Sequence, residues 1–272
     1  MDSSGRKEKD RKKETLREKF KKEPFLIVIY FLLRMIVIVV MVLQARNGNY
    51  MNVFLCLLTL LLFTVPSFIE HRLRIDIPNT LEIIVLIFIF SAEILGEIRS
   101  YYTLYKGWDT ALHTVTGFLT AAVGFSLVDL LNRSSSSVRL SPLFVCLFSV
   151  CFSMTIGVLW EFFESAMDYF FLMDMQKDSI INSIHSVTLD SESLNRVVHI
   201  WDISEVDVNG VSLGLGGYLD IGFYDTIKDL AVTFLGSVIY SFFGFFYLVG
   251  KSDGSFLRRF MPVKKNVNGE EE

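Results

Sequence analysis

An aspartate and a histidine open one of the long apolar stretches of this chain. The sequence "WDTALH" places Asp109 and His113 four residues apart, at the start of the run "TVTGFLTAAVGFSLVDLL". Residues four apart on a helix share one face, so both side chains are expected to point the same way. A carboxylate and an imidazole on one face are suited to binding a metal ion or passing a proton.

Acidic residues with helical spacing also mark three other apolar stretches. They are Glu93 and Glu97 in "SAEILGEIRS", Glu161, Glu164 and Asp168 in "LWEFFESAMD", and Asp225 and Asp229 in "YDTIKDL". An ionisable side chain costs about 2.5–3.5 kcal/mol at the centre of a membrane span, and less near the interface. A set of such residues at similar depth therefore indicates a function or a specific packing role.

Crowded carboxylates repel one another, so they must share protons or hold cations. A divalent cation bound by carboxylate oxygens and one imidazole fits these residue types. The candidate ligands are Asp109, His113, Glu161, Glu164, Asp225 and Asp229, and the candidate catalytic acids or bases are Glu161, Glu164 and Asp229. The arrangement is similar to the carboxylate sites of di-metal helix bundles. The single histidine in these stretches and the absence of a Glu-x-x-His motif argue against a redox di-iron centre, and favour Mg²⁺, Mn²⁺, Ca²⁺ or Zn²⁺.

Three functional interpretations remain open at this point. The first is a metal-assisted enzyme or binding protein that acts on a lipid-linked or cell-envelope substrate. The second is a proton- or cation-coupled transporter that uses the same acids as a relay. The third is a non-catalytic membrane scaffold, in which Asp109 and Asp225 only cap helices and the other polar groups fix helix packing. The sequence holds no nucleophile motif, glycine-rich phosphate loop or inverted repeat that decides between them.

The composition is that of a membrane protein. The chain has 272 residues, of which 51% are hydrophobic and 25 are phenylalanine, and its mean hydropathy is +0.44. Runs of about 20 apolar residues predict membrane-spanning helices. We therefore predict an all-α polytopic membrane protein with six transmembrane helices, at 25–45, 51–69, 81–100, 109–131, 143–166 and 225–250. Five glycines in the last three spans, Gly117, Gly124, Gly157, Gly236 and Gly244, are expected to let helices pack closely.

The basic residues predict the orientation. Residues 1–23 form a tail with ten Lys or Arg, residues 24–250 form the membrane domain, and residues 251–272 form a C-terminal tail. The six-span scheme places 19 basic residues on one side and five on the other, with Arg34 and Lys228 inside spans. The positive-inside rule then predicts a multi-pass plasma-membrane protein with both termini in the cytoplasm. The expected partner is the lipid bilayer and no nucleic-acid partner is expected, while the oligomeric state is left open.

One loop, residues 167–224, is long and is predicted to be extracytoplasmic. It carries nine acidic residues against two basic ones. Apolar and polar residues alternate around Asn209-Gly210, a pair that favours a β-hairpin because both residues tolerate positive φ. We expect a small hairpin there and a short helix at 178–186.

Arg34 and Glu93 are predicted to form an ion pair inside the membrane. Arg34 lies nine residues into its span and Glu93 twelve residues into its own, which correspond to depths of about 14 and 18 Å at 1.5 Å per residue. The alternative is that Arg34 extends its guanidinium towards the cytoplasmic interface.

Four segments together resemble a known bacterial family. The segments "WDTALHTVTGF", "WEFFE", "MDMQKDSIINSI" and "GYLDIGFYDTIKDL" are similar to the YjdF-type inner-membrane proteins, in particular their Gram-positive membrane-spanning branch. A looser similarity connects the layout with VanZ-like glycopeptide-tolerance proteins. The resemblance covers about residues 81–248 and implies a bacterial plasma-membrane protein, without implying an activity. The matching family positions are Asp109, His113, Glu161, Glu164, Asp225 and Asp229.

Overall fold

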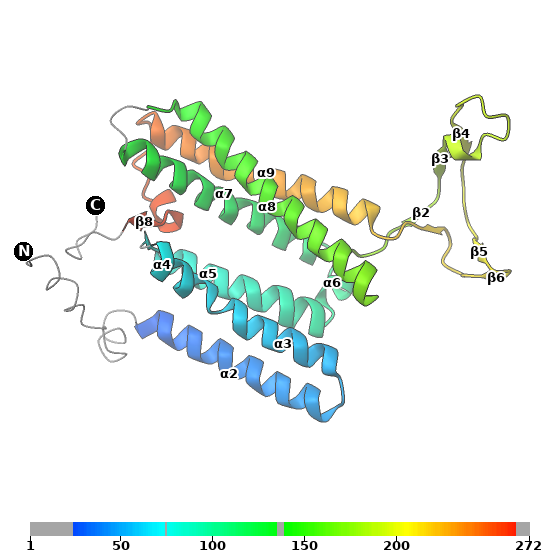
Figure 1. The fold of residues 1–272 in the computed structure, drawn as a ribbon, viewed down its shortest axis with the longest axis horizontal. Coiled ribbons are helices and arrows are strands. Elements are labelled where there is room, and N and C mark those ends of the chain that lie inside the picture. Colours follow the sequence, from blue (N-terminus) through cyan, green and yellow to red (C-terminus); the bar gives the residue numbers. More distant parts are fainter. Residues whose placement is uncertain (1–23, 74, 135–138, 265–272) are drawn as a thin grey trace, which may run out of the picture. The chain divides into compact units, whose positions relative to one another are not determined.

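The structure is a computed structural model that describes residues 24–73, 75–134 and 139–264. The predicted basic tail, residues 1–23, lies outside the described residues. The chain divides into two compact units, one of Met1–Trp108 with Arg258–Glu272 and one of Asp109–Leu257. Helices dominate both units (Figure 1).

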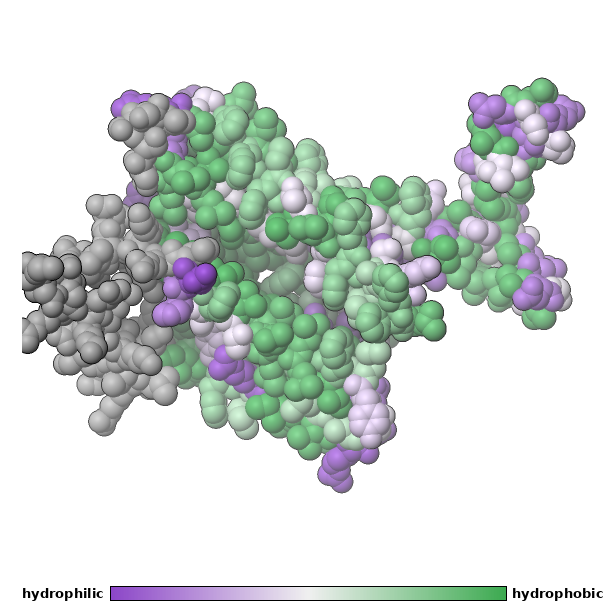
Figure 2. Space-filling view, in the orientation of Figure 1, coloured by the Kyte–Doolittle hydropathy of each residue, from purple (hydrophilic) through white to green (hydrophobic). Residues whose placement is uncertain are grey.

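Five helices in the described residues are long and apolar enough to cross a membrane. They are Pro24–Arg46, Tyr50–Arg72, Trp108–Asn132, Pro142–Phe171 and Phe223–Leu248. On the face drawn in Figure 2, hydrophobic residues cover most of the helical surface. A helix in water would bury this surface, so its exposure fits a lipid environment.

The first unit is built from α2 (Pro24–Arg46), which packs on α3 (Tyr50–Leu62) and α5 (Asn79–Phe90). Its core includes the buried side chains of Val37, Cys56, Phe63, Leu86 and Ile94. The shorter elements are α4 (Val65–Leu73), α6 (Tyr101–Leu104), η3 (Leu257–Phe260, whose last three residues belong to this unit) and the strand pair β1 (Ile75–Asp76) with β8 (Val263–Lys264).

The third predicted span, 81–100, is divided between two kinds of helix. α5 continues without a gap into η1 (Ser91–Ile98), a π-helix that carries Glu93 and Glu97. Because the α-helical part has only 12 residues, the segment is not one of the five long apolar helices. Short π-helical stretches are rare and are often found at functional sites.

The second unit consists of α7 (Trp108–Ser134), α8 (Pro142–Phe171), α9 (Phe223–Leu248) and the loop between α8 and α9. α8 begins where the sequence favours a helix start, because the Ser141 hydroxyl accepts the Phe144 amide and Pro142 follows directly. α8 and α9 pack extensively on each other.

α7 and α9 approach each other closely at two glycines. A Cβ atom on Gly117 of α7 would lie 2.0 Å from the Thr233 carbonyl oxygen, and one on Gly236 of α9 would lie 2.1 Å from the Thr114 carbonyl oxygen. The packing role predicted for these glycines is confirmed. The contact fixes α9 against the part of α7 that carries His113.

The loop from 172 to 222 forms three two-stranded pairs. β2 (Ile180–Ile181) pairs with β7 (Tyr218–Leu219), β3 (Ile184–Ser186) with β4 (Val198–Ile200), and β5 (Asp207–Val208) with β6 (Val211–Ser212). Asn209 and Gly210 connect the last pair with φ values of 56° and 79°, as a type I′ turn requires. A β-hairpin is therefore present at the predicted residues, and its extracytoplasmic position stays a prediction.

The predicted short helix at 178–186 is wrong. Ile180, Ile181 and Ile184 lie in strands instead, and their partners come from residues 198–200 and 218–219. β-branched side chains favour strands, and pairing partners distant in sequence overrode the local polar pattern.

Candidate functional site

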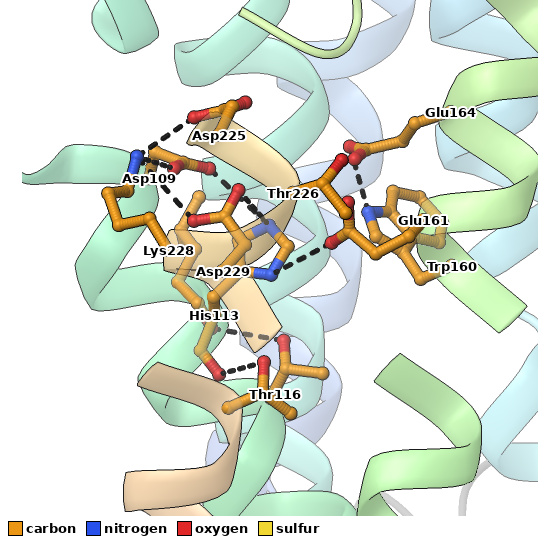
Figure 3. Close-up of polar contacts among 12 residues, drawn as sticks. Asp109, His113, Thr116, Trp160, Glu161, Glu164, Asp225, Thr226, Lys228 and Asp229 are labelled. Atoms are coloured by element: carbon orange, nitrogen blue, oxygen red, sulfur yellow. Dashed lines mark hydrogen bonds and ion pairs between the residues drawn. The ribbon is translucent and has the colours of Figure 1, made fainter. Parts of the chain in front are cut away.

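Three helices of the second unit bring the predicted acids and the histidine together (Figure 3). α7 contributes Asp109 and His113 from its first two turns. α8 contributes Glu161 and Glu164 from its last third, and α9 contributes Asp225 and Asp229 from its first two turns. α7 and α9 begin where α8 ends, so one end of the unit collects all six.

His113 lies between two groups of carboxylates. Its Nε2 atom is 3.4 Å from Asp109 Oδ1 and 3.6 Å from Asp229 Oδ2. Its Nδ1 atom is 3.9 Å from Glu161 Oε1. The two ring nitrogens therefore face different helices, and the imidazole bridges the two groups.

The first group is a lysine cluster made of Asp109, Asp225, Lys228 and Asp229. Lys228 Nζ lies 2.9 Å from Asp109 Oδ2, 2.9 Å from Asp225 Oδ1 and 3.5 Å from Asp229 Oδ1. The Lys228 side chain is 45% exposed, whereas that of Asp229 is 1% exposed. The ammonium group therefore supplies positive charge to three carboxylates from the solvent-accessible edge of the cluster.

The second group is a glutamate pair, Glu161 and Glu164, next to Trp160. The indole N–H of Trp160 donates a hydrogen bond of 2.9 Å to Glu164 Oε1. Both carboxylate oxygens of Glu161 are buried and accept no hydrogen bond from the described residues. Burying a carboxylate without hydrogen bonds is costly, so Glu161 is the group at this site that most needs a further partner.

The loop that follows α8 is attached to the same region by backbone amides. Asp168 accepts the amides of Met175 and Gln176, at 2.6 and 2.8 Å. Asp225 accepts the Lys177 amide at 2.9 Å, and the Gln176 side chain donates to the Thr226 hydroxyl at 2.6 Å. Both oxygens of Asp225 are thus engaged, one by the loop and one by Lys228, which gives this carboxylate a structural role.

Two sets of three side chains have the spacing of metal ligands. Asp109, His113 and Asp229 form one set, and His113, Glu161 and Glu164 form the other. Within each set the ligand atoms lie within 4.8 Å of one another. The first set already has Lys228 as its cation, whereas the second set contains Glu161, whose buried oxygens accept no hydrogen bond from the described residues. Of the six predicted ligands, Asp225 belongs to neither set.

The balance of charges at the site also indicates that a further cation or shared protons are needed. Five carboxyl groups and one lysine surround His113, so the site has more potential negative charge than positive charge. Buried carboxylates in such excess need either protons or a bound cation.

Lys228, Trp160 and Gln176 are site residues that the spacing argument did not identify. Lys228 is three residues after Asp225 and one before Asp229, so its place on the acidic face of α9 was a readable signal. Trp160 is four residues before Glu164 on one helix, so helical spacing was a readable signal for it too. Gln176 carried no such signal, because its contact depends on how the loop after α8 folds.

Arg34 and Glu93 both lie in the first unit. The Arg34 guanidinium carbon is 5.1 Å from the centre of the Tyr30 ring, and the Tyr30 hydroxyl donates to Glu82 Oε1 at 2.6 Å. Within the described residues no ion pair joins Arg34 to Glu93, and Glu93 is buried on η1. The arginine has an aromatic contact instead, and the predicted pair stays a prediction.

The chain is a membrane protein of a known family. Long apolar helices and a family match define an integral membrane protein. Residues 26–250 match the family described as "Predicted membrane protein (DUF2238)", and the chain belongs to it. This family fits the YjdF-type resemblance at a coarse level. No curated protein and no solved structure matches the chain.

Proposed function

We propose that this membrane protein binds a divalent metal ion through His113, Glu161 and Glu164, and uses it on a lipid-linked or cell-envelope substrate. The observation that carries the proposal is Glu161, whose two buried oxygens accept no hydrogen bond from the described residues while facing the His113 ring. A cation between these groups offsets the cost of burying the carboxylate.

The surroundings of His113 fit a metal ligand. Metal-binding histidines usually donate their second ring N–H to a carboxylate, which fixes the tautomer and the ring orientation. Here Nδ1 faces the glutamate pair, and Nε2 faces Asp109 and Asp229 at 3.4 and 3.6 Å. Lys228 in turn balances the charge of these two aspartates.

The ligand types favour Zn²⁺ or Mn²⁺ among the four candidate ions. Imidazole is a frequent ligand of Zn²⁺ and a poor one for Mg²⁺ or Ca²⁺, whereas carboxylates bind all four. Three protein ligands leave an open coordination position, as in catalytic rather than structural zinc sites. Such a metal supplies Lewis-acid chemistry, and Asp229 is then the buried carboxylate that orients His113.

Metal analysis of the protein purified in detergent tests the proposal. We expect about one equivalent of Zn²⁺ or Mn²⁺ per chain after reconstitution, and loss of that metal in His113→Ala and Glu161→Gln. Asp129→Asn is the matched control, because Asp129 is another buried carboxylate of α7, sixteen residues after His113. Equal metal content in the wild type and Glu161→Gln would contradict the proposal.

A proton- or cation-coupled transporter is the second candidate, because buried hydroxyls continue from the site along the three helices. The Thr233 hydroxyl donates to the His113 carbonyl oxygen at 3.3 Å, and Thr120 and Ser153 share a 2.8 Å hydrogen bond. Ser149 donates to the Ala121 carbonyl oxygen, and Ser241 donates to Ser149. A polar route of this kind suits ion passage. Proton flux into liposomes that Glu161→Gln abolishes, in protein free of metal, would favour this candidate.

We also propose six membrane crossings in the plasma membrane, with both termini cytoplasmic. The supporting observations are the basic-residue asymmetry and the strand pair β1–β8. Hydrogen-bonded strands must lie on the same side of a bilayer, so an even number of crossings separates residue 76 from residue 263. α7, α8 and α9 supply three, and the continuous segment α5–η1 supplies the fourth.

A further inference from the structure

Two histidines face each other across the strand pair β3–β4 in the long loop. His185 and His199 occupy directly opposite positions in the antiparallel register. Their Nδ1 atoms are 2.9 Å apart, and both side chains are exposed. Directly opposite residues on one face of a sheet hold their side chains close together, so the backbone sets this proximity.

We propose that His185 and His199 form a second metal site, specific for a late divalent transition metal such as Cu²⁺ or Ni²⁺. Two imidazole nitrogens bound at about 2.0–2.1 Å and about 90° apart are separated by about 2.9 Å. The two Nδ1 atoms, 2.9 Å apart, are therefore close enough to reach one metal ion after a small rotation of each ring. The distance is also that of the hydrogen bond between the rings, so the choice of metal rests on the donors: affinity of nitrogen ligands for divalent first-row metals rises through Ni²⁺ to Cu²⁺.

The connection between the two strands holds the pair in place. Asp190, a buried carboxylate, accepts the backbone amides of Glu192, Leu194 and Arg196 at 3.1, 2.9 and 3.1 Å. These bonds organise the chain between Ser186, where β3 ends, and Val198, where β4 begins. A preorganised connection lowers the entropy that binding must overcome, so the two imidazoles act as one chelating unit.

Only a small movement separates the observed pair from a metal-bound one. In the structure one neutral ring donates its Nδ1–H to the Nδ1 lone pair of the other. Transfer of that proton through solvent to Nε2 of the same ring keeps the ring neutral, and a rotation of each ring about its Cβ–Cγ bond then turns both Nδ1 lone pairs towards one point. The remaining coordination positions face solvent, because both rings are exposed.

Trp201 provides a built-in reporter for this site. Its ring centre lies 4.5 Å from that of His185 and 5.9 Å from that of His199. Cu²⁺ bound to the pair is therefore expected to quench the fluorescence of Trp201. Of the other two tryptophans, Trp108 begins α7, and Trp160 donates to Glu164 and would respond to metal at the His113 site.

The test uses the full-length His113→Ala variant in detergent, titrated with Cu²⁺ alone, because Cu²⁺ at the His113 site would quench Trp160 beside it. We expect stoichiometric quenching and a paramagnetic resonance spectrum with two nitrogen ligands. The double variant His185→Asn/His199→Asn should lose both signals, and each single variant should bind Cu²⁺ at least about a hundredfold more weakly, because the chelate is broken. Trp201→Phe should keep the two-nitrogen spectrum and lose the quenching, which separates loss of ligands from loss of the reporter.

This inference is independent of the proposed function. The His113→Ala background removes the proposed first site, so the Cu²⁺ signals that remain belong to the histidine pair. The double histidine variant in the otherwise wild-type chain should keep the Zn²⁺ or Mn²⁺ of the glutamate pair. Identical Cu²⁺ titrations of His113→Ala with and without the two histidine substitutions would overturn the proposal, and would leave the pair as a cross-strand hydrogen bond only.

Discussion

Lys228 is the residue that most changes the interpretation of the acidic cluster. Without Lys228, the carboxylates of Asp109, Asp225 and Asp229 would form an anionic site open to a metal ion. The Lys228 ammonium group already supplies the positive charge that balances these three carboxylates. The metal proposal therefore rests on Glu161 and Glu164, on the other side of His113. One lysine thus separates the candidate ligands into three aspartates that it contacts and two glutamates that it does not.

Lys228→Met is expected to destabilise the protein by about 1–3 kcal/mol. Removing one partner of a fully buried ion pair costs about 3–5 kcal/mol, and the half-exposed position of Lys228 reduces that value. The measurement is the thermal midpoint in detergent. Lys228→Arg is the control that keeps the charge, and adding Asp109→Asn to Lys228→Met should restore part of the loss. A wild-type midpoint for Lys228→Met would show that Lys228 does not hold the cluster.

Trp160→Phe isolates the hydrogen bond that orients Glu164. The change keeps an aromatic ring and removes the N–H that donates to Glu164 Oε1. Loss of a hydrogen bond behind a metal ligand typically weakens metal affinity by about 10–100-fold, which is the effect we expect here. Calorimetric titration of metal-free protein with Zn²⁺ measures it. Unchanged affinity would exclude Glu164 as an oriented ligand.

For single residues, the sequence predicted well which side chains lie at the site, and predicted poorly which neighbours they contact. Asp109, His113, Glu161 and Glu164 were predicted from i, i+3 and i+4 spacing, and the structure places them together. The aromatic contact of Arg34 with Tyr30 was not predicted, because depth along a helix does not determine which neighbour a flexible side chain selects. Spacing fixes the face of a helix, but packing of the helices decides the contact.

Among the helices, the contact between α7 and α9 depends on two glycines. Gly117→Ala and Gly236→Ala should each lower the thermal midpoint, because the new Cβ atom would lie about 2 Å from a backbone carbonyl oxygen that cannot rotate away. Overpacking of this kind costs about 1–3 kcal/mol. Gly157→Ala is the matched control, since its Cβ would lie 3.1 Å from the Thr233 methyl group. Equal midpoints for all three variants would contradict the close contact.

The β3–β4 connection should lose its order in acid. Three backbone amides donate to Asp190 and hold the pKa of its carboxyl below the usual value of about 3.9. A lowered folded-state pKa gives a stabilisation that is complete above the usual value and is lost as pH falls through the lower one. We expect intrinsic-rate-corrected hydrogen-exchange protection of Leu194 and Arg196 to stay constant from pH 7 to 5, and to fall at lower pH as the Asp190 carboxylate becomes protonated. Asp190→Asn should reduce this protection between pH 7 and 5. Unchanged protection in that variant would show that the Asp190 carboxylate does not hold the β3–β4 connection in place.

Local signals predicted some elements of the long loop and missed others. The Asn209-Gly210 turn needs only two residues with positive φ, so the sequence was sufficient for it. The strands at 180–186 were missed because their partners are up to 39 positions away in the sequence. The π-helix η1 was also missed, since an apolar run does not report which hydrogen-bond pattern it adopts.

For the whole molecule, the number of membrane crossings determines where every site lies. Five crossings would place the two termini on opposite sides, and six place them on the same side. The segment from Asn79 to Ile98 decides between these, because its 20 residues would span about 30 Å at an α-helical rise. The strand pair β1–β8 requires this segment to cross if α7, α8 and α9 each cross once.

Accessibility labelling of single cysteines tests this prediction. Cys56, Cys146 and Cys151 are first replaced by alanine or serine, and one cysteine is then introduced at Asp76, Ser100, Ser204 or Ser252. A membrane-impermeant maleimide applied to intact cells should label positions 100 and 204, and should label 76 and 252 only after the cells are opened. Labelling of 76 and 100 from the same side would show that α5–η1 does not cross. Labelling of 252 but not 204 in intact cells would reverse the orientation and place the His113 site and the His185–His199 pair on the cytoplasmic side, where a substrate of the cell envelope could not reach them.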